Sequence, residues 1–262
     1  DTYGDNQTEL ESTSNGENLG NLGISMSKDG STIALTEQLG TVDIRIKKLV
    51  NGSWTNIWDT SVLSGNDSRP SLNYDGSRVV FNNYTNQIAY VYEYSGSGTT
   101  WNQVGSAIPN TGGSSHSSST SINNAGDIVA VNEEVGDTVS VYQFVDTDWV
   151  KLGSTLTHPD GAGSEFGVKT KLNAAGDMII IGAGVADTIH IFKYQNGDWV
   201  QIGDTLTGIG SSQTFGATVA ISDDGTKILG SGANDDLNGT NSGYVQAFQW
   251  PTKSYGPLID IS

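Results

Sequence analysis

A pattern of apolar positions around a glycine turn recurs five times along the 262 residues. An apolar side chain stands four residues before each glycine, and a β-branched one stands three residues after it. These anchor glycines are Gly30, Gly76, Gly126, Gly176 and Gly225, at spacings of 46, 50, 50 and 49 residues. Glycine tolerates the positive φ of a tight hairpin turn, and β-branched residues suit a half-buried sheet. The pattern therefore predicts a strand, a turn and a second strand in every unit.

Each unit continues with two further apolar stretches. The third is exemplified by QIAYVYEY (87–94) and TIHIFKY (188–194). The fourth begins at an aromatic residue 23 to 30 positions after the anchor, and these aromatics are Trp54, Trp101, Trp149, Trp199 and Tyr255. It is repeated almost unchanged as DWVKLGSTL (148–156) and DWVQIGDTL (198–206), which we interpret as one outer strand per unit. We expect the recurring aromatic side chains to pack between neighbouring sheets.

Four strands in a unit of 46 to 50 residues are typical of a β-propeller blade. A single blade cannot bury both of its faces, so blades stack around a common axis. The sequence predicts an all-β fold, a five-bladed β-propeller of four-stranded antiparallel blades. The blades are expected at about 19–65, 66–113, 114–163, 164–212 and 213–262, after an N-terminal extension over 1–18. An open stack of sheets or a two-sheet sandwich is the alternative.

Two units resemble a known repeat family. The segments FGVKTKLNAAGDMIIIGAG from Phe166 and FGATVAISDDGTKILGSGAND from Phe215 resemble FG-GAP repeats, the blade type of integrin α-subunit propellers. The first three units keep the strand and turn pattern but lack the Phe-Gly pair: Asn66 and His116 stand at the phenylalanine position in the second and third units. The resemblance implies a propeller, and it says little about activity.

The resemblance also implies a calcium loop in the last unit. In NDDLNGTNS (234–242), the side chains of Asn234, Asp236 and Asn238 alternate as oxygen ligands do in such a loop. Two of these three positions carry an amide where the family has aspartate, which weakens the attraction for a hard cation. A polar hairpin loop without metal is the alternative. We expect no cofactor other than this Ca²⁺.

The charge of the chain limits its partners. Twelve Lys and Arg residues against 29 Asp and Glu give a net charge of -17, which disfavours nucleic acid and anionic lipid surfaces. No run of 18 apolar residues occurs, so we expect no membrane insertion. Without cysteine, disulfides and thiolate metal sites are excluded.

Localisation is predicted from weaker signals. The chain starts at Asp1 without a basic leader, as a processed, exported protein would, and we expect an extracellular or cell-surface location. A trimmed chain would look the same. Five Asn-x-Ser/Thr sites allow glycosylation, and they are Asn6, Asn51, Asn66, Asn83 and Asn238.

Catalytic motifs are hard to find in this chain. The histidines His116, His158 and His190 are dispersed over the units, and no nucleophile elbow, phosphate loop or His-Glu-x-x-His motif occurs. A propeller hydrolase of the glycosidase type would need carboxylates converging in a central pocket. The sequence therefore predicts no catalytic residues and a non-enzymatic protein.

The two ends of the chain compete for one place in the propeller. The segment around Tyr3 and Leu10 and the segment around Tyr255 and Leu258 both match an outer strand, so five blades have six candidates. A surplus strand can pair with the sheet edge of a neighbouring molecule, and head-to-tail pairing of this kind builds filaments. A frayed tail is the alternative, and which end closes the ring is left open.

Function is predicted from these features together. The first interpretation is an extracellular structural or surface-interaction subunit, a homo-oligomer that assembles into filaments through the surplus strand. The second is a lectin or adhesin propeller that binds a glycan or protein, with Trp58 and Trp250 as surface contacts because they fall outside the aromatic register. The third is a propeller hydrolase.

Overall fold

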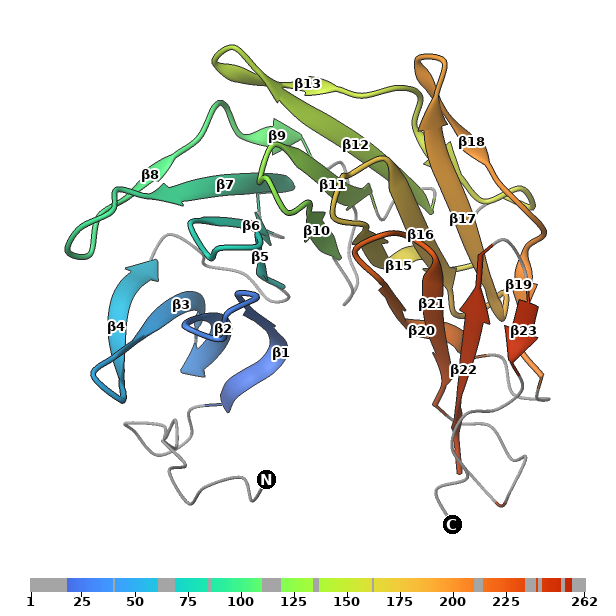
Figure 1. Cartoon of the computed structure of the whole chain (residues 1–262), viewed down its shortest axis with the longest axis horizontal. Coiled ribbons are helices and arrows are strands. Elements are labelled where there is room, and N and C mark those ends of the chain that lie inside the picture. Colours follow the sequence, from blue (N-terminus) through green and yellow to red (C-terminus); the bar gives the residue numbers. More distant parts are fainter. Residues whose placement is uncertain are drawn as a thin grey trace.

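The structure, a computed structural model, confirms an all-β architecture. It describes residues 18–39, 41–60, 69–83, 86–109, 119–133, 137–161, 163–209, 214–233, 239, 242–250 and 253–255. Throughout these ranges the regular elements are β-strands, and they form five separate antiparallel sheets. The sheets stand side by side around a common axis as the five blades of a β-propeller (Figure 1).

Each blade follows the order of the chain from its inner to its outer strand. Blade 1 contains β1 (Asn18–Met26), β2 (Thr32–Leu39), β3 (Thr41–Val50) and β4 (Ser53–Thr60). Blade 2 contains β5 (Ser71–Leu72), β6 (Arg78–Asn83), β7 (Ile88–Tyr94), β8 (Trp101–Gln103) and β9 (Ile108–Pro109). Blade 3 contains β10 (Thr120–Ile122), β11 (Ile128–Glu133), β12 (Thr138–Val145), β13 (Asp148–Lys151) and β14 (Leu156–Thr157).

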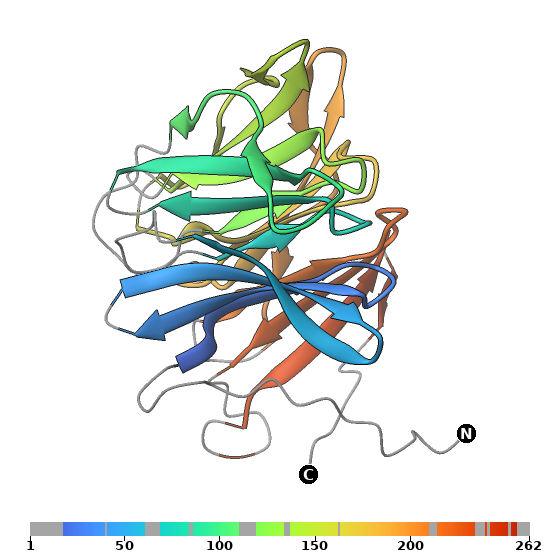
Figure 2. The same ribbon diagram turned by 90° about the vertical axis from the view of Figure 1, so that its left-hand side faces the viewer.

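The last two blades repeat this order. Blade 4 contains β15 (Phe166–Leu172), β16 (Met178–Ala183), β17 (Thr188–Gln195), β18 (Asp198–Gln201) and β19 (Leu206–Thr207). Blade 5 contains β20 (Phe215–Ile221), β21 (Lys227–Gly232), β22 (Tyr244–Gln249) and β23 (Lys253–Tyr255). Figure 2 shows the strands of blade 1 in side view, crossed by the strands of the blades behind them.

The turns between the first two strands of each blade meet at one end of the axis. All five anchor glycines have positive φ, between 70° and 79°, as the tight turn requires. In blades 1 to 4, the residue two positions before the anchor donates its backbone N–H to the carbonyl of its equivalent in the next blade. These bonds join Lys28 to Tyr74 at 2.8 Å, Tyr74 to Asn124 at 3.3 Å, Asn124 to Ala174 at 3.1 Å and Ala174 to Asp223 at 3.1 Å. A continuous belt of backbone bonds therefore links the five blades in order.

Hydrophobic clusters fill four junctions between blades. The apolar residues four positions before the anchors, such as Leu72, Ile122 and Leu172, are buried there against the preceding blade. The equivalent Met26 of blade 1 is 62% exposed. Within the described residues no such cluster joins blade 5 to blade 1, and the exposed ion pair of Lys28 and Asp223, at 3.2 Å, bridges this junction.

The outer strand differs from the prediction in one respect. DWVQIGDTL does not form one strand, because β18 and β19 are separated at residues 202–205 and pair with opposite ends of β17. Gly203 lies in this break with a φ of 67°. The Trp250 ring covers Gly203 so closely that a Cβ at this position would collide with it. The outer strands of blades 2 and 3 break in the same way at Gly105 and Gly153, which also have positive φ, so the break belongs to the repeat.

The recurring tryptophans pack between blades, as predicted. The Trp149 indole donates a hydrogen bond of 2.7 Å to the carbonyl of Val104, and the Trp199 indole donates one of 2.8 Å to the carbonyl of Leu152. Each acceptor belongs to the preceding blade. The indole therefore joins two blades while its ring fills the space between them.

Candidate active site

The inner ends of the five blades surround a cavity on the propeller axis. Its volume is about 230 Å³, and every blade contributes residues to its wall. The wall follows the repeat: the residue seven positions before the anchor glycine lies on it in all five blades. These five residues are Gly23, Arg69, Ser119, Lys169 and Thr218. The cavity, called the central channel below, is therefore built from one structural position repeated around the axis.

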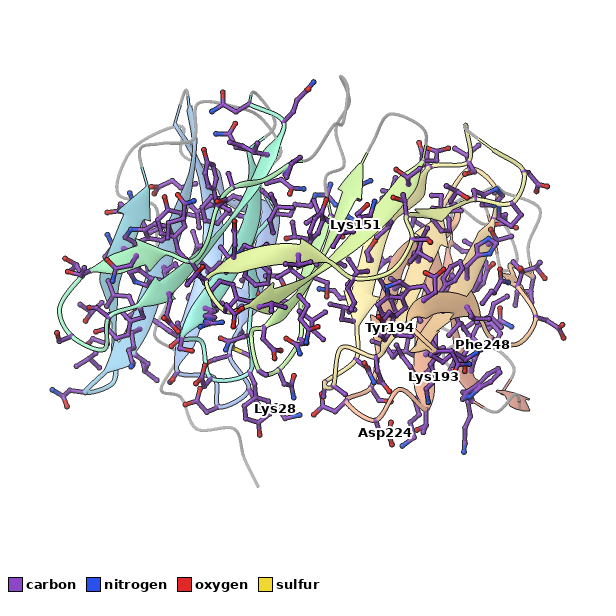
Figure 3. The ribbon with its side chains drawn as sticks, turned by 90° about the horizontal axis from the view of Figure 1, so that it is seen from above. Lys28, Lys151, Lys193, Tyr194, Asp224 and Phe248 are labelled. Carbon is purple, nitrogen blue, oxygen red and sulfur yellow. The ribbon has the colours of Figure 1, made fainter. Side chains whose placement is uncertain are left out.

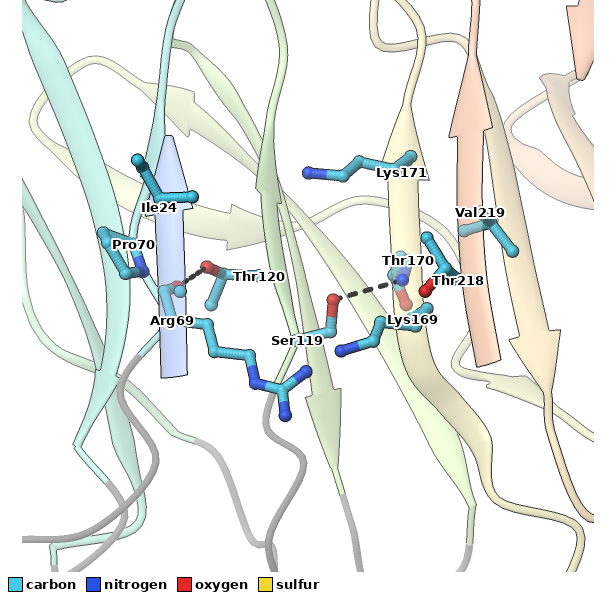
Figure 4. A pocket seen from close by; sticks show the side chains of 11 residues that line it. Ile24, Arg69, Pro70, Ser119, Thr120, Lys169, Thr170, Lys171, Thr218 and Val219 are labelled. Atoms are coloured by element: carbon cyan, nitrogen blue, oxygen red, sulfur yellow. Dashed lines mark hydrogen bonds between the residues drawn. The ribbon is translucent and has the colours of Figure 1, made fainter. Parts of the chain in front are cut away.

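Three cationic side chains converge in the central channel. Arg69 enters it from blade 2, and Lys169 and Lys171 enter it from β15 of blade 4. Figure 4 shows the arginine reaching in from one side and the two lysines extending toward it from the other. Lys169 is half-buried, and Lys171 is exposed to the channel. Among the described residues that line the channel, none is acidic.

Local structure sets the direction of the two lysines. The Phe-Gly pair of blade 4 forms a bulge, in which the pairing of β15 with β16 shifts between Phe166 and Lys169. Gly167 adopts a φ of 94° there, and a Cβ on it would lie 2.8 Å from a methyl group of Val139. After the bulge, Lys169 and Lys171 alternate with Thr170 and Leu172, whose side chains are buried. The lysines therefore share one face of the strand.

Hydrogen bonds between blades hold the wall of the channel. The Thr120 hydroxyl donates to the carbonyl of Arg69 at 2.8 Å, and the backbone N–H of Thr170 donates to the Ser119 hydroxyl oxygen at 3.1 Å (Figure 4). Blade 3 is thereby fixed to the segments of blades 2 and 4 that carry the cations. Groups with fixed positions can act on a ligand without reorganising first.

The charge of the channel is opposite to that of the whole protein. The chain has a net charge of -17 and only 12 Lys and Arg residues, yet three of these line one cavity. On strands away from the channel, cations pair with acids: Arg45 with Glu37 and Asp59, and Arg78 with Glu93. Within the described residues neither Lys169 nor Lys171 forms an ion pair. The channel therefore offers positive charge to an anionic ligand.

Burial lowers the pKa of the Lys171 ammonium. Its side chain is exposed to the channel, whose wall comes from all five blades, and such a space solvates a charge less well than bulk water does. Lowering this pKa increases the fraction of neutral amine at a given pH. Lys171 is therefore a better proton acceptor than a surface lysine.

The junction of blades 5 and 1 lies beside the channel. Ile24, which is 68% exposed, and Thr218 both line the cavity and come from these two blades. A second, apolar groove of about 230 Å³ continues from Thr218 along blade 5 and includes Leu229 and Val245. The channel thus opens toward the junction that no hydrophobic cluster fills in the described part of the chain.

The two tryptophans proposed as surface contacts are half-buried packing residues. The Trp58 ring lies 4.7 Å from the Tyr92 ring and 5.5 Å from the Trp101 ring, measured between centroids. Trp250 covers Gly203 and packs against the cluster between blades 4 and 5. Their binding of another molecule stays a prediction.

Other predicted site residues are scattered. Asn51 is exposed in the β3–β4 turn, whereas Asn83 is only 2% exposed, so a glycan there would require the strand end to open. Outside the described residues lie the calcium positions Asn234, Asp236 and Asn238, the terminal residues Tyr3, Leu10 and Leu258, the sequons Asn6 and Asn66, and His116. For Tyr255 the structure describes the backbone, in β23. In the described part of the chain, no cluster of three His, Cys, Asp or Glu residues could hold a metal ion, and no helix could cross a membrane.

His158 and His190 come together away from the channel. Their ring centroids are 4.9 Å apart, and both side chains are buried beside Phe166. Burial, and secondarily the neighbouring His158, lower the pKa of His190. The pair is a structural part of the core rather than a part of the channel wall.

The channel cations were missed in the sequence, although a signal for them exists. When the five units are aligned on their anchors, the position seven residues before the glycine reads Gly, Arg, Ser, Lys and Thr. Two long cations among small residues stand out in a chain so poor in Lys and Arg. Arg69 and Lys169 occupy equivalent positions of two blades but lie 100 residues apart in the sequence. Their side chains come together only because the blades are arranged around a common axis.

Comparisons with known proteins support the fold. No protein-family model matches the chain, and no curated protein matches it. Among solved structures, a candidate 6-phosphogluconolactonase from Bacteroides fragilis superposes with a TM-score of 0.66 at 15% identity, over 91% of this chain and 71% of that one. The periplasmic gluconolactonase of Pseudomonas aeruginosa gives 0.62 at 15% identity, over 90% and 69%. A Lactobacillus plantarum protein gives 0.65 at 18% identity, over 92% and 70%.

These neighbours correct two sequence-based predictions. They are propellers similar to 6-phosphogluconolactonase rather than FG-GAP propellers, so the finer family assignment is not supported. Several bear the names of enzymes, which contradicts the interpretation as a non-enzymatic structural subunit and points to a hydrolase propeller. At identities of 10% to 18% the likeness establishes the fold: the chain is a five-bladed β-propeller.

Proposed function

We propose that this protein is a lactone hydrolase whose active site is the central channel. The observation that carries the proposal is the convergence of Arg69, Lys169 and Lys171 in a cavity to which all five blades contribute. Solved structures with the same fold that are named as gluconolactonases support it by analogy.

Lactone opening needs two things that these residues supply. Water adds to the lactone carbonyl carbon, and negative charge then develops on the carbonyl oxygen. Fixed positive charge on the wall of the same cavity stabilises this negative charge, the more so in a cavity with little water. The bond from the carbonyl carbon to the ring oxygen then breaks, and the products are a hydroxyl group and a carboxylate.

Lys171 is our candidate for the group that accepts the proton of the attacking water. Its lowered pKa leaves more neutral amine than an ordinary lysine has. After the ring bond breaks, the same ammonium can return the proton to the departing ring oxygen. Arg69 cannot replace it, because a guanidinium stays protonated.

The channel favours an ester-type bond over a glycosidic bond. Glycosidases require two carboxylates on either side of the scissile bond, and the described wall of the channel has no acidic residue. The carboxylate requirement stated for a glycosidase-type propeller is therefore not met among these residues. A lactone needs an activated water and positive charge, which the wall provides.

Hydrolysis of δ-gluconolactone and of 6-phosphogluconolactone, followed by acid release and corrected for the spontaneous reaction, tests the proposal. We expect wild-type protein to accelerate at least one of them. Lys171→Met should lower kcat/KM by about 10²-fold or more, as expected for loss of a general base. Lys171→Arg should be similarly impaired, because it keeps the charge and cannot accept a proton.

Lys151→Met is the matched control, since it removes the same charge from the exposed outer strand β13 (Figure 3). It should leave the rate unchanged. Equal rates for wild type and Lys171→Met, or no acceleration of either lactone by the folded wild type, would show that the channel is not a lactonase site.

A further inference from the structure

One named neighbour is a 6-phosphogluconolactonase and another is a gluconolactonase, so their names differ in the phosphate of the substrate. The channel of this protein contains cationic side chains that could distinguish the two kinds of ligand. We infer that Arg69 and Lys169 bind a phosphate monoester, so that the preferred ligand is a sugar phosphate rather than a neutral sugar. The assignment of a lactone as the ligand rests on the proposed function. The assignment of a phosphate site is independent of it.

Arg69 and Lys169 lie at the same level of the channel. Each stands seven residues before its anchor glycine, so the repeat places them at equivalent heights on blades 2 and 4. Figure 4 shows their charged ends on the same side of Ser119, facing each other across the channel. A group bound between them would be contacted from two sides.

Lys171 lies at a different level. It follows Lys169 by two residues on β15, which corresponds to about 6.6 Å along a strand. A hexose with a phosphate at one end has its other end at a comparable distance. Arg69 and Lys169 can therefore hold the phosphate while Lys171 acts at the carbonyl, and the three cations have two separate roles.

The charge of the channel favours a dianion over a carboxylate. A phosphate monoester carries about -1.5 to -2 at neutral pH. Two facing cations match this charge, and a guanidinium can donate two parallel hydrogen bonds to phosphate oxygens. Among the described residues Lys169 forms no ion pair that a phosphate would have to displace. The rest of the protein is negatively charged and repels anions, so an anionic ligand binds in the channel rather than on the outer surface.

Calorimetric titration with glucose 6-phosphate and with glucose tests the phosphate site without involving lactone chemistry. Glucose 6-phosphate should bind at least about tenfold more tightly than glucose, and added salt should reduce the difference. Lys169→Met should remove about tenfold of the affinity for glucose 6-phosphate, and Lys169→Arg should retain most of it.

Gluconate is the probe for a carboxylate. If it binds as tightly as glucose 6-phosphate, or if glucose does, the phosphate assignment is wrong. Lys151→Met provides the control for overall charge, and an equal loss with it and with Lys169→Met would also overturn the assignment. Phosphate binding without lactone hydrolysis would uphold the site and refute only the proposed function.

Discussion

Tryptophan and aspartate at the start of an outer strand both contact the preceding blade. The Trp199 indole donates to the carbonyl of Leu152, and its ring lies over Gly153, where a Cβ would approach it to 2.9 Å. Asp198 accepts a hydrogen bond of 2.7 Å from the N–H of Ser154, and this backbone bond lowers the pKa of the carboxyl. Blade 3 repeats these contacts toward blade 2 through Asp148. The duplicated DW sequence therefore makes the same contact at two junctions, between blades 2 and 3 and between blades 3 and 4.

Removal of the indole hydrogen bond should be measurable. Trp199→Phe should lower the free energy of unfolding by about 1 kcal/mol beyond the loss of ring area, because it leaves the carbonyl of the half-buried Leu152 without this donor. Trp54→Phe, in the same register of blade 1, is the control, since the Trp54 indole donates to no described residue. Equal losses in urea denaturation of the two variants would contradict the role of the hydrogen bond.

The buried histidine pair should make stability depend on pH. Burial and the neighbouring His158 lower the pKa of His190 below its ordinary value of 6.5. Between these two values the unfolded chain binds a proton that the folded protein does not, so stability should fall as the pH decreases below 6.5. The thermal midpoint of His190→Gln should fall less than that of wild type between pH 7 and pH 5. Asp29 and Asp224, with pKa values of about 2, contribute only at lower pH. If the thermal midpoints of both proteins fell equally between pH 7 and pH 5, His190 would not be the source of the pH dependence.

At the scale of elements, the sequence predicted strand order better than strand ends. The anchor glycines and the apolar alternation depend on neighbours in the chain, so the hairpin and third strand of each blade could be located directly. At the break in the outer strand of blade 4, Trp250 covers Gly203, a contact between residues 47 positions apart. The convergence of Arg69 and Lys171 likewise depends on how the blades close. Periodicity predicts which elements form, and it does not show which side chains meet across the axis.

The contact at the break in the outer strand of blade 4 can be tested with two glycines of similar φ. Gly203 and Gly197 have φ values of 67° and 89°, but only Gly203 is covered by a ring, and a Cβ on Gly197 would meet nothing within 4 Å. Gly197→Ala should cost about 1 kcal/mol for the backbone conformation. Gly203→Ala should cost about 1–3 kcal/mol more because of overpacking against Trp250. Equal costs in chemical denaturation would show that the ring does not constrain the break.

At the scale of the whole molecule, the propeller has four apolar junctions and one that differs. Blades 1 to 5 follow one another through buried clusters, whereas Lys28 and Asp223 bridge blade 5 and blade 1 with side chains that are 58% and 60% exposed. Exposed ion pairs of this kind contribute little to stability. The channel opens beside this junction, so the least tightly packed part of the ring is also the side from which a ligand can reach the cations.

An acidic particle with a cationic centre accounts for the proposed selectivity. Negative charge on the outer surface repels anions, while three cations inside one cavity attract them, so an anionic ligand is bound at one place. The same charge distribution would pull a newly formed carboxylate toward Lys171, and we therefore expect the product 6-phosphogluconate to occupy the channel as well.

A crystal structure of the protein soaked with 6-phosphogluconate tests this account most directly. We predict that the phosphate lies between Arg69 and Lys169 and that the carboxylate lies beside Lys171, inside the central channel. A channel that stays empty at saturating product, or a product molecule bound only on the outer blades, would contradict the assignment of the channel as the active site.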